Sequence, residues 1–172
     1  MREGTPFDPV AVARIGVMVE MGLIGLEQLI AWADAWVMKL DDSPRWLLEL
    51  CTAPDTPTAL GLLRGIPRLP SPATPEERRA ADADHLASLF LRYRHGALSW
   101  GAFLLQGGQL LDRSDDLGRC EAFFMQRDLL ERMGFPEALV RAQREDIERS
   151  LEGALERMES AHRQFEAEAR GS

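Results

Sequence analysis

Apolar residues recur every three or four positions along most of the chain, and polar, proline or glycine residues separate the periodic stretches. This spacing places the apolar side chains on one face of a helix. It predicts helices over residues 9–21, 26–40, 45–53, 57–64, 75–95, 97–111, 117–133 and 136–169. Strands favour β-branched residues, and Val, Ile and Thr supply only 16 of the 172 positions. We therefore expect an all-α protein with seven or eight helices.

Four prolines in the segment 66–75 interrupt the helical pattern. Proline cannot continue a helix and restrains the residue before it, so this segment is predicted to be a linker. It separates a helical group over residues 1–65 from a second group over residues 76–172. Each group is small for an independent core, and we therefore expect both to pack into a single domain that spans residues 1–172.

Residues 97–111 are apolar on nearly every side, which predicts the most buried helix of the fold. Gly101, Gly107 and Gly108 lie in this helix and would let neighbouring helices approach closely. Two of the helix ends have distinct signals. Thr74 precedes a proline and two glutamates, as in a capping box, and Gly134 is a typical left-handed residue after a helix.

The predicted last helix is long for a chain of this size. About 33 residues at 1.5 Å each give roughly 50 Å, which exceeds the width of a compact domain. Its apolar residues form one stripe with heptad spacing: Ile147, Leu151, Ala154, Met158, Ala161 and Phe165. We therefore expect the end of this helix to protrude and to expose Met158 and Phe165. An exposed apolar seam is an association site, so a homodimer through this helix is one expected assembly.

The net charge of −8 is spread evenly along the chain. Nucleic-acid binding needs clustered cations that neutralise phosphates, and binding to a membrane surface needs a basic helix face. The sequence has neither pattern, and it predicts neither a secretory signal nor a membrane span. We expect a cytoplasmic protein without a cofactor, whose partner is another protein of basic charge.

Two histidines follow a carboxylate at a spacing of three residues, in the pairs Asp82–His85 and Glu159–His162. This spacing places both groups of a pair on one helix face, and ferritin-like di-iron bundles use two Glu-x-x-His pairs of this kind. A metal-carboxylate helical-bundle enzyme is therefore the alternative function. The other interpretation is that both are solvated histidines at the edge of an apolar face, because one pair has Asp in place of Glu and the other lies in a strongly charged stretch.

The two cysteines, Cys51 and Cys120, lie far apart and have neither zinc-site nor C-x-x-C spacing. We expect two reduced, buried thiols. No nucleophile motif, P-loop or dinucleotide-binding motif occurs in the sequence, so no catalytic residue is assigned.

Three tryptophans lie close together in the first helical group. Trp32 and Trp36 are one helical turn apart beside an apolar stripe, and Trp46 lies at the start of the next helix. Tryptophan is favoured at the energetic centres of interfaces, so all three are candidate partner-binding residues, together with Met158 and Phe165. The alternative is that they fill the groove between neighbouring helices.

The segment 22–53 contains three short motifs in order. They are Gly22-Leu-Ile24, Ala31-Trp-Ala-Asp34 and Ser43-Pro44-Arg-Trp46-Leu-Leu-Glu49-Leu50. Together they resemble a segment of small all-helical bacterial proteins, some of which are suspected immunity-type factors. The resemblance implies a helical fold and no catalytic residues. We therefore expect a non-enzymatic, acidic protein-binding module, of which an immunity or antitoxin-like factor and an adaptor are concrete forms.

Overall fold

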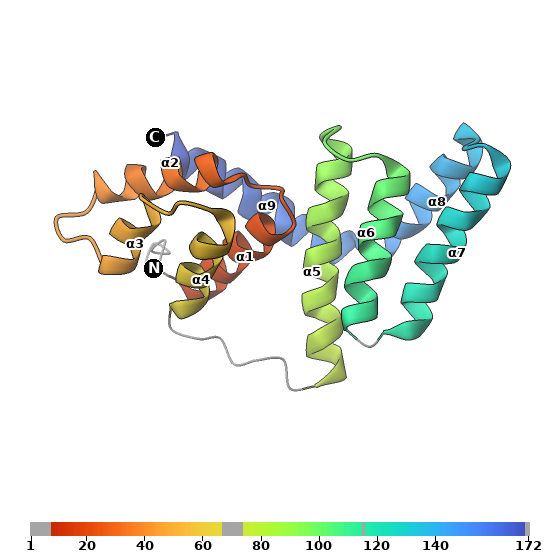
Figure 1. Ribbon diagram of the computed structural model, residues 1–172, viewed down its shortest axis with the longest axis horizontal. Helices are drawn as coiled ribbons and strands as arrows, with labels where there is room; N and C mark the ends of the chain where they lie inside the picture. The colour runs from red at the N-terminus through yellow and green to blue at the C-terminus, as the bar shows by residue number, and fades with distance from the viewer. Residues whose placement is uncertain (1–7, 67–73, 115, 171–172) are drawn as a thin grey trace. The chain divides into compact units, whose positions relative to one another are not determined.

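The computed structural model describes residues 8–66, 74–114 and 116–170. Helices make up 79% of these residues and none of them lies in a strand, which confirms the all-α prediction. The helices of this part of the chain (Figure 1) are α1 (Pro9–Glu20), α2 (Leu26–Val37), α3 (Arg45–Leu50), α4 (Thr56–Gly65), α5 (Pro75–Arg94), α6 (Trp100–Arg113), α7 (Leu117–Met133), α8 (Glu137–Ser150) and α9 (Glu152–Ala169).

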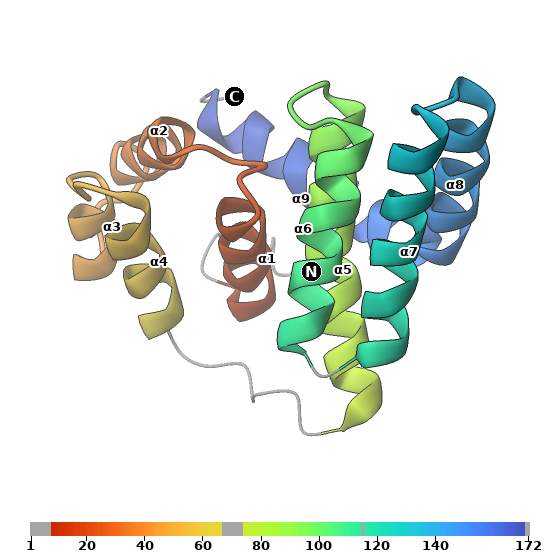
Figure 2. The same ribbon diagram turned by 45° about the vertical axis from the view of Figure 1, so that its right-hand side comes forward.

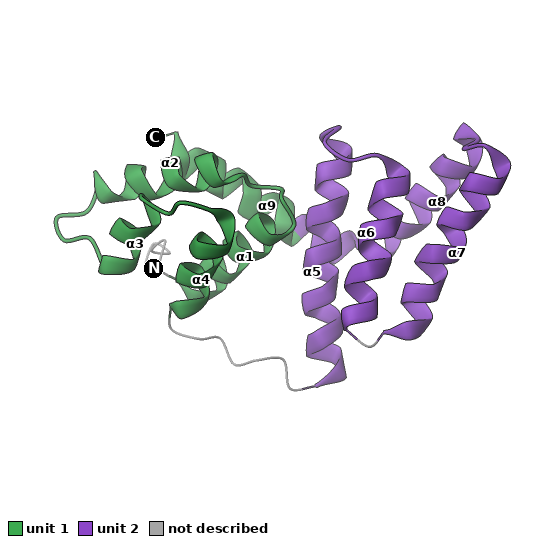
Figure 3. Cartoon of the chain, in the orientation of Figure 1, with its two compact units in different colours: residues 1–71, 157–172 green, residues 72–156 purple. Residues whose placement is uncertain are grey.

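The helices cluster into two compact units (Figure 3). Unit 1 comprises residues 1–71 and 157–172, and unit 2 comprises residues 72–156. The first boundary falls within the predicted linker 66–75, of which residues 67–73 lie outside the described part of the chain. The second boundary differs from the predicted grouping. It places most of α9 in the unit that contains α1, whereas the sequence predicts that residues 76–172 form one group. The packing of both helical groups into one domain stays a prediction.

In unit 1, α1 packs against α4, and α3 packs against both α2 and α4. Gly22, with a φ of +70°, turns the chain between α1 and α2, at the break that the sequence predicts. These four helices and the part of α9 in unit 1 supply its core, and the side chains with no exposed surface are Met18, Leu29, Trp32, Ala33, Leu47, Leu50, Ala59 and Met158.

Unit 2 contains α5, α6 and α7, which lie side by side (Figures 1 and 2), with α8 packed on α7. Its core is aromatic. Phe103 on α6 stacks on Trp100 with 4.8 Å between ring centroids, meets Phe90 of α5 edge-on at 5.6 Å, and lies 5.8 Å from Phe123 of α7. Offset and edge-to-face geometries of this kind stabilise aromatic clusters beyond the burial of their area.

A buried glutamine attaches α8 to the other helices of unit 2. Gln143 on α8 is only 7% exposed. Its side-chain oxygen accepts a hydrogen bond from the indole Nε1 of Trp100 at 3.0 Å, and its Nε2 donates to the backbone carbonyl of Gln126 at 3.1 Å. A buried amide with both groups paired holds neighbouring elements in one arrangement. Gln143 therefore joins α8 to α6 and to α7.

Two adjacent glycines let α7 approach α6 closely. A Cβ on Gly107 would lie 2.5 Å from Cε1 of Phe123, and a Cβ on Gly108 would lie 2.8 Å from Cε1 of Phe124. Distances this short are not tolerated by real Cβ atoms, so the two rings occupy the space that the missing side chains leave. The close approach expected at Gly107 and Gly108 is confirmed.

The most buried helical segment is not the predicted one. The buried positions of α6 lie on one face only: Trp100, Phe103, Leu104, Gly107, Gly108 and Leu111. In α5, by contrast, six consecutive residues from Leu86 to Leu91 are buried, which is more than a full turn. The apolar character of residues 97–111 reflects close packing on one side, whereas the middle of α5 is covered on every side.

The predicted helix over 136–169 is two helices, α8 and α9, with a break at Leu151. Leu151 has φ −106° and ψ 4°, and its N–H points to the carbonyls of both Ile147 and Glu148, at 3.0 and 3.2 Å. The hydroxyl of Ser150 also donates to the carbonyl of Ile147, at 2.7 Å. Serine hydroxyls that bond back to a carbonyl of the preceding turn compete with the helical ladder and bend it. This break raises the number of described helices from the expected seven or eight to nine.

Both helix-end signals that we singled out are confirmed. Thr74 and Glu77 form a reciprocal capping box, in which the N–H of Glu77 donates to Oγ1 of Thr74 at 3.1 Å and the N–H of Thr74 donates to Oε2 of Glu77 at 2.9 Å. Gly134 follows α7 with a φ of +72°, in the left-handed region. Local capping chemistry therefore determines where α5 begins and where α7 ends.

We expect Gly107→Ala to destabilise the protein, because the added methyl group would overlap the buried ring of Phe123. Overpacking of a core costs about 1–3 kcal/mol, which outweighs the gain of about 1 kcal/mol in helix propensity. Gly118→Ala is the matched control, since this glycine lies in α7 of the same unit and an added Cβ would meet no atom within 4 Å. Urea unfolding followed by circular dichroism measures both variants. A Gly107→Ala protein as stable as Gly118→Ala would contradict the close approach.

Candidate functional site

Two of the candidate partner-binding tryptophans bind a carboxylate of the same unit. The indole Nε1 groups of Trp32 and Trp36 both donate to Oε2 of Glu168 on α9, at 2.8 and 3.3 Å. Trp32 is fully buried, and its ring stacks on Phe165 with 6.0 Å between centroids and 22° between planes. These contacts attach α9 to α2, so Trp32 stabilises the fold of unit 1.

Met158 and Phe165 are not exposed, which corrects the expectation for the C-terminal helix. Met158 is 0% exposed and Phe165 is 3% exposed. The break at Leu151 divides the predicted stripe, with Ile147 on α8 and the last four residues on α9, and apart from the half-buried Ala161 all six residues are buried. For Phe165 the physical reason is that the ring of Trp32 covers it. Met158, Phe165 and Trp32 therefore offer no surface to a partner, and the expected homodimer loses the observation on which it was based.

Apart from the fully buried Trp32, the candidate tryptophans of unit 1 keep part of their surface exposed. Trp36 and Trp46 are both half-buried. The ammonium group of Lys39 lies 5.2 Å from the centroid of the Trp36 ring, within the range of a cation–π interaction. Trp36 thus has contacts with both a carboxylate and a cation of its own unit, which favours a structural role for it.

The carboxylate–histidine pairs do not form a metal centre among the described residues. Asp82 and His85 belong to unit 2, whereas Glu159 and His162 belong to unit 1. Asp82 accepts a hydrogen bond from the hydroxyl of Ser114 at 2.7 Å, and Nδ1 of His85 donates to the carbonyl of Ala81 at 2.8 Å. In the part of the chain that the structure describes, no three His, Cys, Asp or Glu side chains are arranged to hold an ion.

Exposed apolar side chains concentrate on one helix of unit 2. Nine large apolar side chains are exposed among the described residues, and six of these nine belong to α7 or to the turn that follows it. The six are Leu117, Phe124, Met125, Leu129, Met133 and Phe135. Contiguous exposed apolar groups mark association sites, whereas scattered ones are ordinary. Helix α7 is therefore the strongest candidate for a functional surface.

Three of these residues form a row along α7, which we call the α7 stripe: Met125, Leu129 and Met133. They are 70%, 40% and 57% exposed, and their spacing of four residues places them on one face. The buried residues of α7, by contrast, are Cys120, Phe123 and Leu130. The helix thus has two apolar faces, and the rest of the chain covers one of them. The sequence contains this signal, since 125, 129 and 133 are apolar at helical spacing, but it does not say which face is covered.

The turn after α7 holds another exposed aromatic ring in place. Gly134 and Phe135 form a Schellman motif, in which the N–H of Phe135 donates to the carbonyl of Leu130 at 2.9 Å. Phe135 itself has a φ of +57°, which is uncommon for a bulky residue and strains the backbone. Its ring lies beside Gly101 of α6, where a Cβ would come within 3.3 Å. The ring therefore packs on α6 and is still 49% exposed.

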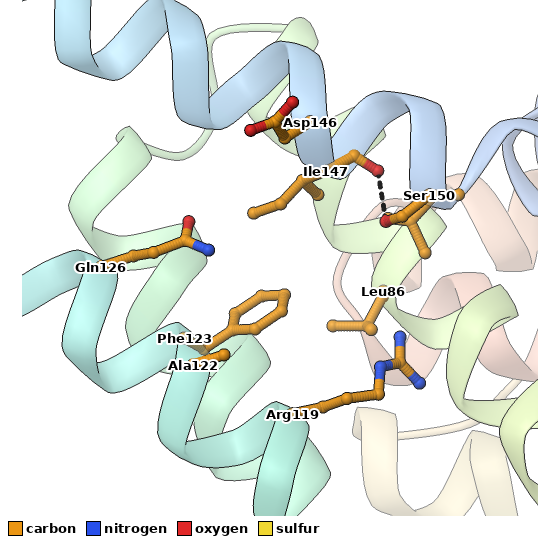
Figure 4. Close-up of a pocket in the computed structure, with 9 residues that line it drawn as sticks. Leu86, Arg119, Ala122, Phe123, Gln126, Asp146, Ile147 and Ser150 are labelled. Atoms are coloured by element: carbon orange, nitrogen blue, oxygen red, sulfur yellow. Dashed lines mark hydrogen bonds between the residues drawn. The ribbon is translucent and has the colours of Figure 1, made fainter.

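A small pocket lies between α5, α7 and α8 of unit 2 (Figure 4). Its volume is about 220 Å³, below the range of roughly 300–1,000 Å³ that is typical of small-molecule sites. The nine residues that line it are Leu86, Arg119, Ala122, Phe123, Gln126, Asp146, Ile147, Ser150 and Leu151. The side-chain Oε1 of Gln126 is buried without a hydrogen-bond partner. The pocket is thus small, and all the residues that line it belong to unit 2.

Neither cysteine has the environment of a reactive thiol. Burial, a hydrogen bond to the carboxylate of Asp34 and the negative charge of that carboxylate together raise the pKa of Cys51 to about 11. Burial also raises the pKa of Cys120, as do the nearby acids Asp112, Glu121 and Asp116. Reactive cysteines lie in electropositive surroundings that lower the pKa. Both thiols are free and stay protonated at neutral pH; Cys120 is buried as expected, whereas Cys51 is half-buried.

We expect Glu168→Leu to lower the free energy of unfolding of unit 1 by about 1–3 kcal/mol, because the buried indole N–H of Trp32 then has no acceptor. Glu168→Gln is the control, since its amide oxygen can still accept. Urea unfolding followed by tryptophan fluorescence measures the difference. If both variants lost the same stability, the hydrogen bonds to the indoles would not be the stabilising contact.

Alkylation tests the environment of Cys51. In a Cys120→Ser background, we expect the rate of reaction with iodoacetamide to keep rising by about tenfold per pH unit up to near pH 11, because only the thiolate reacts. Asp34→Asn should lower the pKa of Cys51 and accelerate the reaction at pH 8. Mass spectrometry of the modified chain gives the rate. A rate that levels off below pH 9 would show that Asp34 and burial do not act on this thiol.

No protein-family model, no curated protein and no solved structure matches the chain. Within the described residues, no helix combines the length and the apolar character that a membrane crossing requires.

Proposed function

We propose that the chain is a protein-binding module whose contact surface is centred on the α7 stripe. The observation that carries this proposal is the concentration of exposed apolar side chains on α7 and its following turn, with Met125 70% exposed and Met133 57% exposed. Burying such side chains against a partner removes apolar area from water, which favours association by roughly 25 cal/mol per Å². Methionine suits this role because its flexible thioether adapts to the shape of a partner.

The charge of unit 2 indicates the kind of partner. Unit 2 contains 16 acidic and 11 basic residues, a net charge of −5 within the total of −8. An acidic module attracts a basic protein over a distance and accelerates the encounter. The occupant that we propose for the α7 stripe is therefore a basic partner protein with an apolar centre to its interface. An immunity-type factor that covers a basic enzyme and an adaptor are two concrete forms of this function.

The test of this proposal compares two pairs of substitutions. The first variant, Met125→Glu with Met133→Glu, places two charges in the α7 stripe. The matched control, Met38→Glu with Leu48→Glu, places two charges at exposed apolar positions of unit 1, where Met38 is 86% exposed and Leu48 is 47% exposed. Proteins captured from native lysate by the wild-type chain are identified, purified and titrated against all three forms.

We expect the stripe variant to bind a basic partner at least about tenfold more weakly, because a charge in the apolar centre of an interface is desolvated without a counter-charge. The control should bind like the wild type. Equal affinities for the wild type and the stripe variant would refute the proposal. A wild-type chain that dimerises by sedimentation, and a stripe variant that does not, would show that the occupant is a second copy and would overturn the basic partner.

A further inference from the structure

We propose that Met125 and Met133 form a reversible oxidation site, at which a hydroperoxide converts both thioethers to sulfoxides and thereby closes the α7 stripe to its partner. The last step rests on the proposed function, since it requires that the stripe binds a protein. The oxidation itself does not rest on it, because it follows from the exposure and chemistry of the sulfur atoms.

The methionines of the described chain divide sharply by exposure. Met18 and Met158 are 0% exposed, and Met21 is half-buried. Met38, Met125 and Met133 are exposed by 86%, 70% and 57%. A peroxide must reach the sulfur atom to react with it, so oxidation of the folded protein is directed to the last three. Two of these three lie in the α7 stripe, and the third lies in unit 1 and serves as an internal control.

The cysteines do not compete for the oxidant. A thiol reacts with a peroxide as the thiolate, and both thiols of this chain are held in the protonated form by burial and by neighbouring carboxylates. A thioether has no proton to lose, so its reactivity depends on access alone. Among the described residues, the exposed methionines are therefore the groups that respond first to a peroxide.

The chemical step is a two-electron oxygen transfer. A lone pair on the methionine sulfur attacks one oxygen of hydrogen peroxide, the O–O bond breaks, and a sulfur–oxygen bond forms. The second oxygen takes up the proton of the first and leaves as water. Sulfur loses two electrons, which the peroxide gains. The product is a polar, chiral side chain in place of an apolar one, and sulfoxide reductases return it to the thioether.

The position of the two sulfur atoms makes this change effective. Met125 and Met133 flank Leu129, so oxidation places a strong dipole on each side of the central residue of the stripe. A sulfoxide oxygen must keep its hydrogen bond to water or find a donor in the partner, and an apolar interface offers none. Oxidation therefore opposes the burial that the proposed function requires and leaves the covered face of α7, with Phe123 and Leu130, untouched.

The first experiment treats the purified full chain with hydrogen peroxide and follows each methionine by peptide mass spectrometry, with circular dichroism as a check that the chain stays folded. We expect Met38, Met125 and Met133 to oxidise on the order of tenfold faster than Met18 and Met158, since access limits the reaction. Equal rates at Met125 and at the buried Met158 in the folded protein would overturn the oxidation site, whatever the stripe binds.

The second experiment measures the surface with the neutral apolar dye Nile red, so that it needs no partner. We expect peroxide to reduce the dye's fluorescence on the wild type by at least half, and the two methionine sulfoxide reductases to restore it. The Met125→Leu, Met133→Leu variant should keep its fluorescence under peroxide, whereas the control Met38→Leu should respond like the wild type. An equal loss in the double leucine variant would show that the effect does not come from the stripe.

The partner identified for the stripe supplies the third measurement. Peroxide should weaken its binding to the wild type at least fivefold and leave binding to the double leucine variant unchanged. If the partner tolerates glutamate at Met125 and Met133 while both sulfur atoms still oxidise first, the proposed function fails and the oxidation site stands. If glutamate abolishes binding and sulfoxide does not, the regulatory step alone is refuted.

Discussion

The contact between α6 and α7 determines both the interior and the exterior of unit 2. Gly107 and Gly108 remove two side chains from α6, and the rings of Phe123 and Phe124 take their place. Because adjacent positions on a helix are about 100° apart, seating Phe123 in this gap sets the rotation of α7 about its own axis. That rotation turns Met125, Leu129 and Met133 outward. The packing of α7 on α6 in the core thus determines which residues of α7 form the surface that we propose for binding.

The sequence predicts the two helix ends and the close approach of α7 to the glycines of α6 correctly, whereas it misses the helix break at Leu151 and the burial of the C-terminal stripe. The capping box at Thr74 and the left-handed Gly134 involve neighbours along the chain, and both are as predicted. The burial of Phe165 depends on Trp32, which lies more than a hundred residues earlier. Helical periodicity identifies an apolar face but does not identify what covers it, so the stripe on α9 was predicted and its exposure was wrong. For the same reason the sequence does not predict that the α7 stripe is exposed, because its apolar spacing is that of a buried helix face.

The tryptophans illustrate why residue type alone is a weak guide to binding. Their enrichment at interfaces reflects a large apolar ring with one polar group, and the same properties suit a groove between helices in which an acceptor is present. Glu168 is that acceptor for Trp32 and Trp36. No spacing in the sequence pairs a carboxylate on α9 with an indole on α2. The methionines and leucine of α7, which are less distinctive as residue types, are the ones that reach the solvent.

Unit 1 is discontinuous in sequence, since residues 72–156 are inserted between its two parts. During synthesis, α1 to α4 leave the ribosome long before the part of α9 that supplies Phe165 and Glu168. The apolar face of α2, including Trp32, therefore stays uncovered while the ribosome translates all of unit 2. This takes roughly 5–15 s at the usual rates of elongation. Unit 2 is contiguous and can close its aromatic core in that interval. A chain that stalls or is cut after α8 would release an N-terminal group with its tryptophans uncovered, a state that chaperones and proteases recognise.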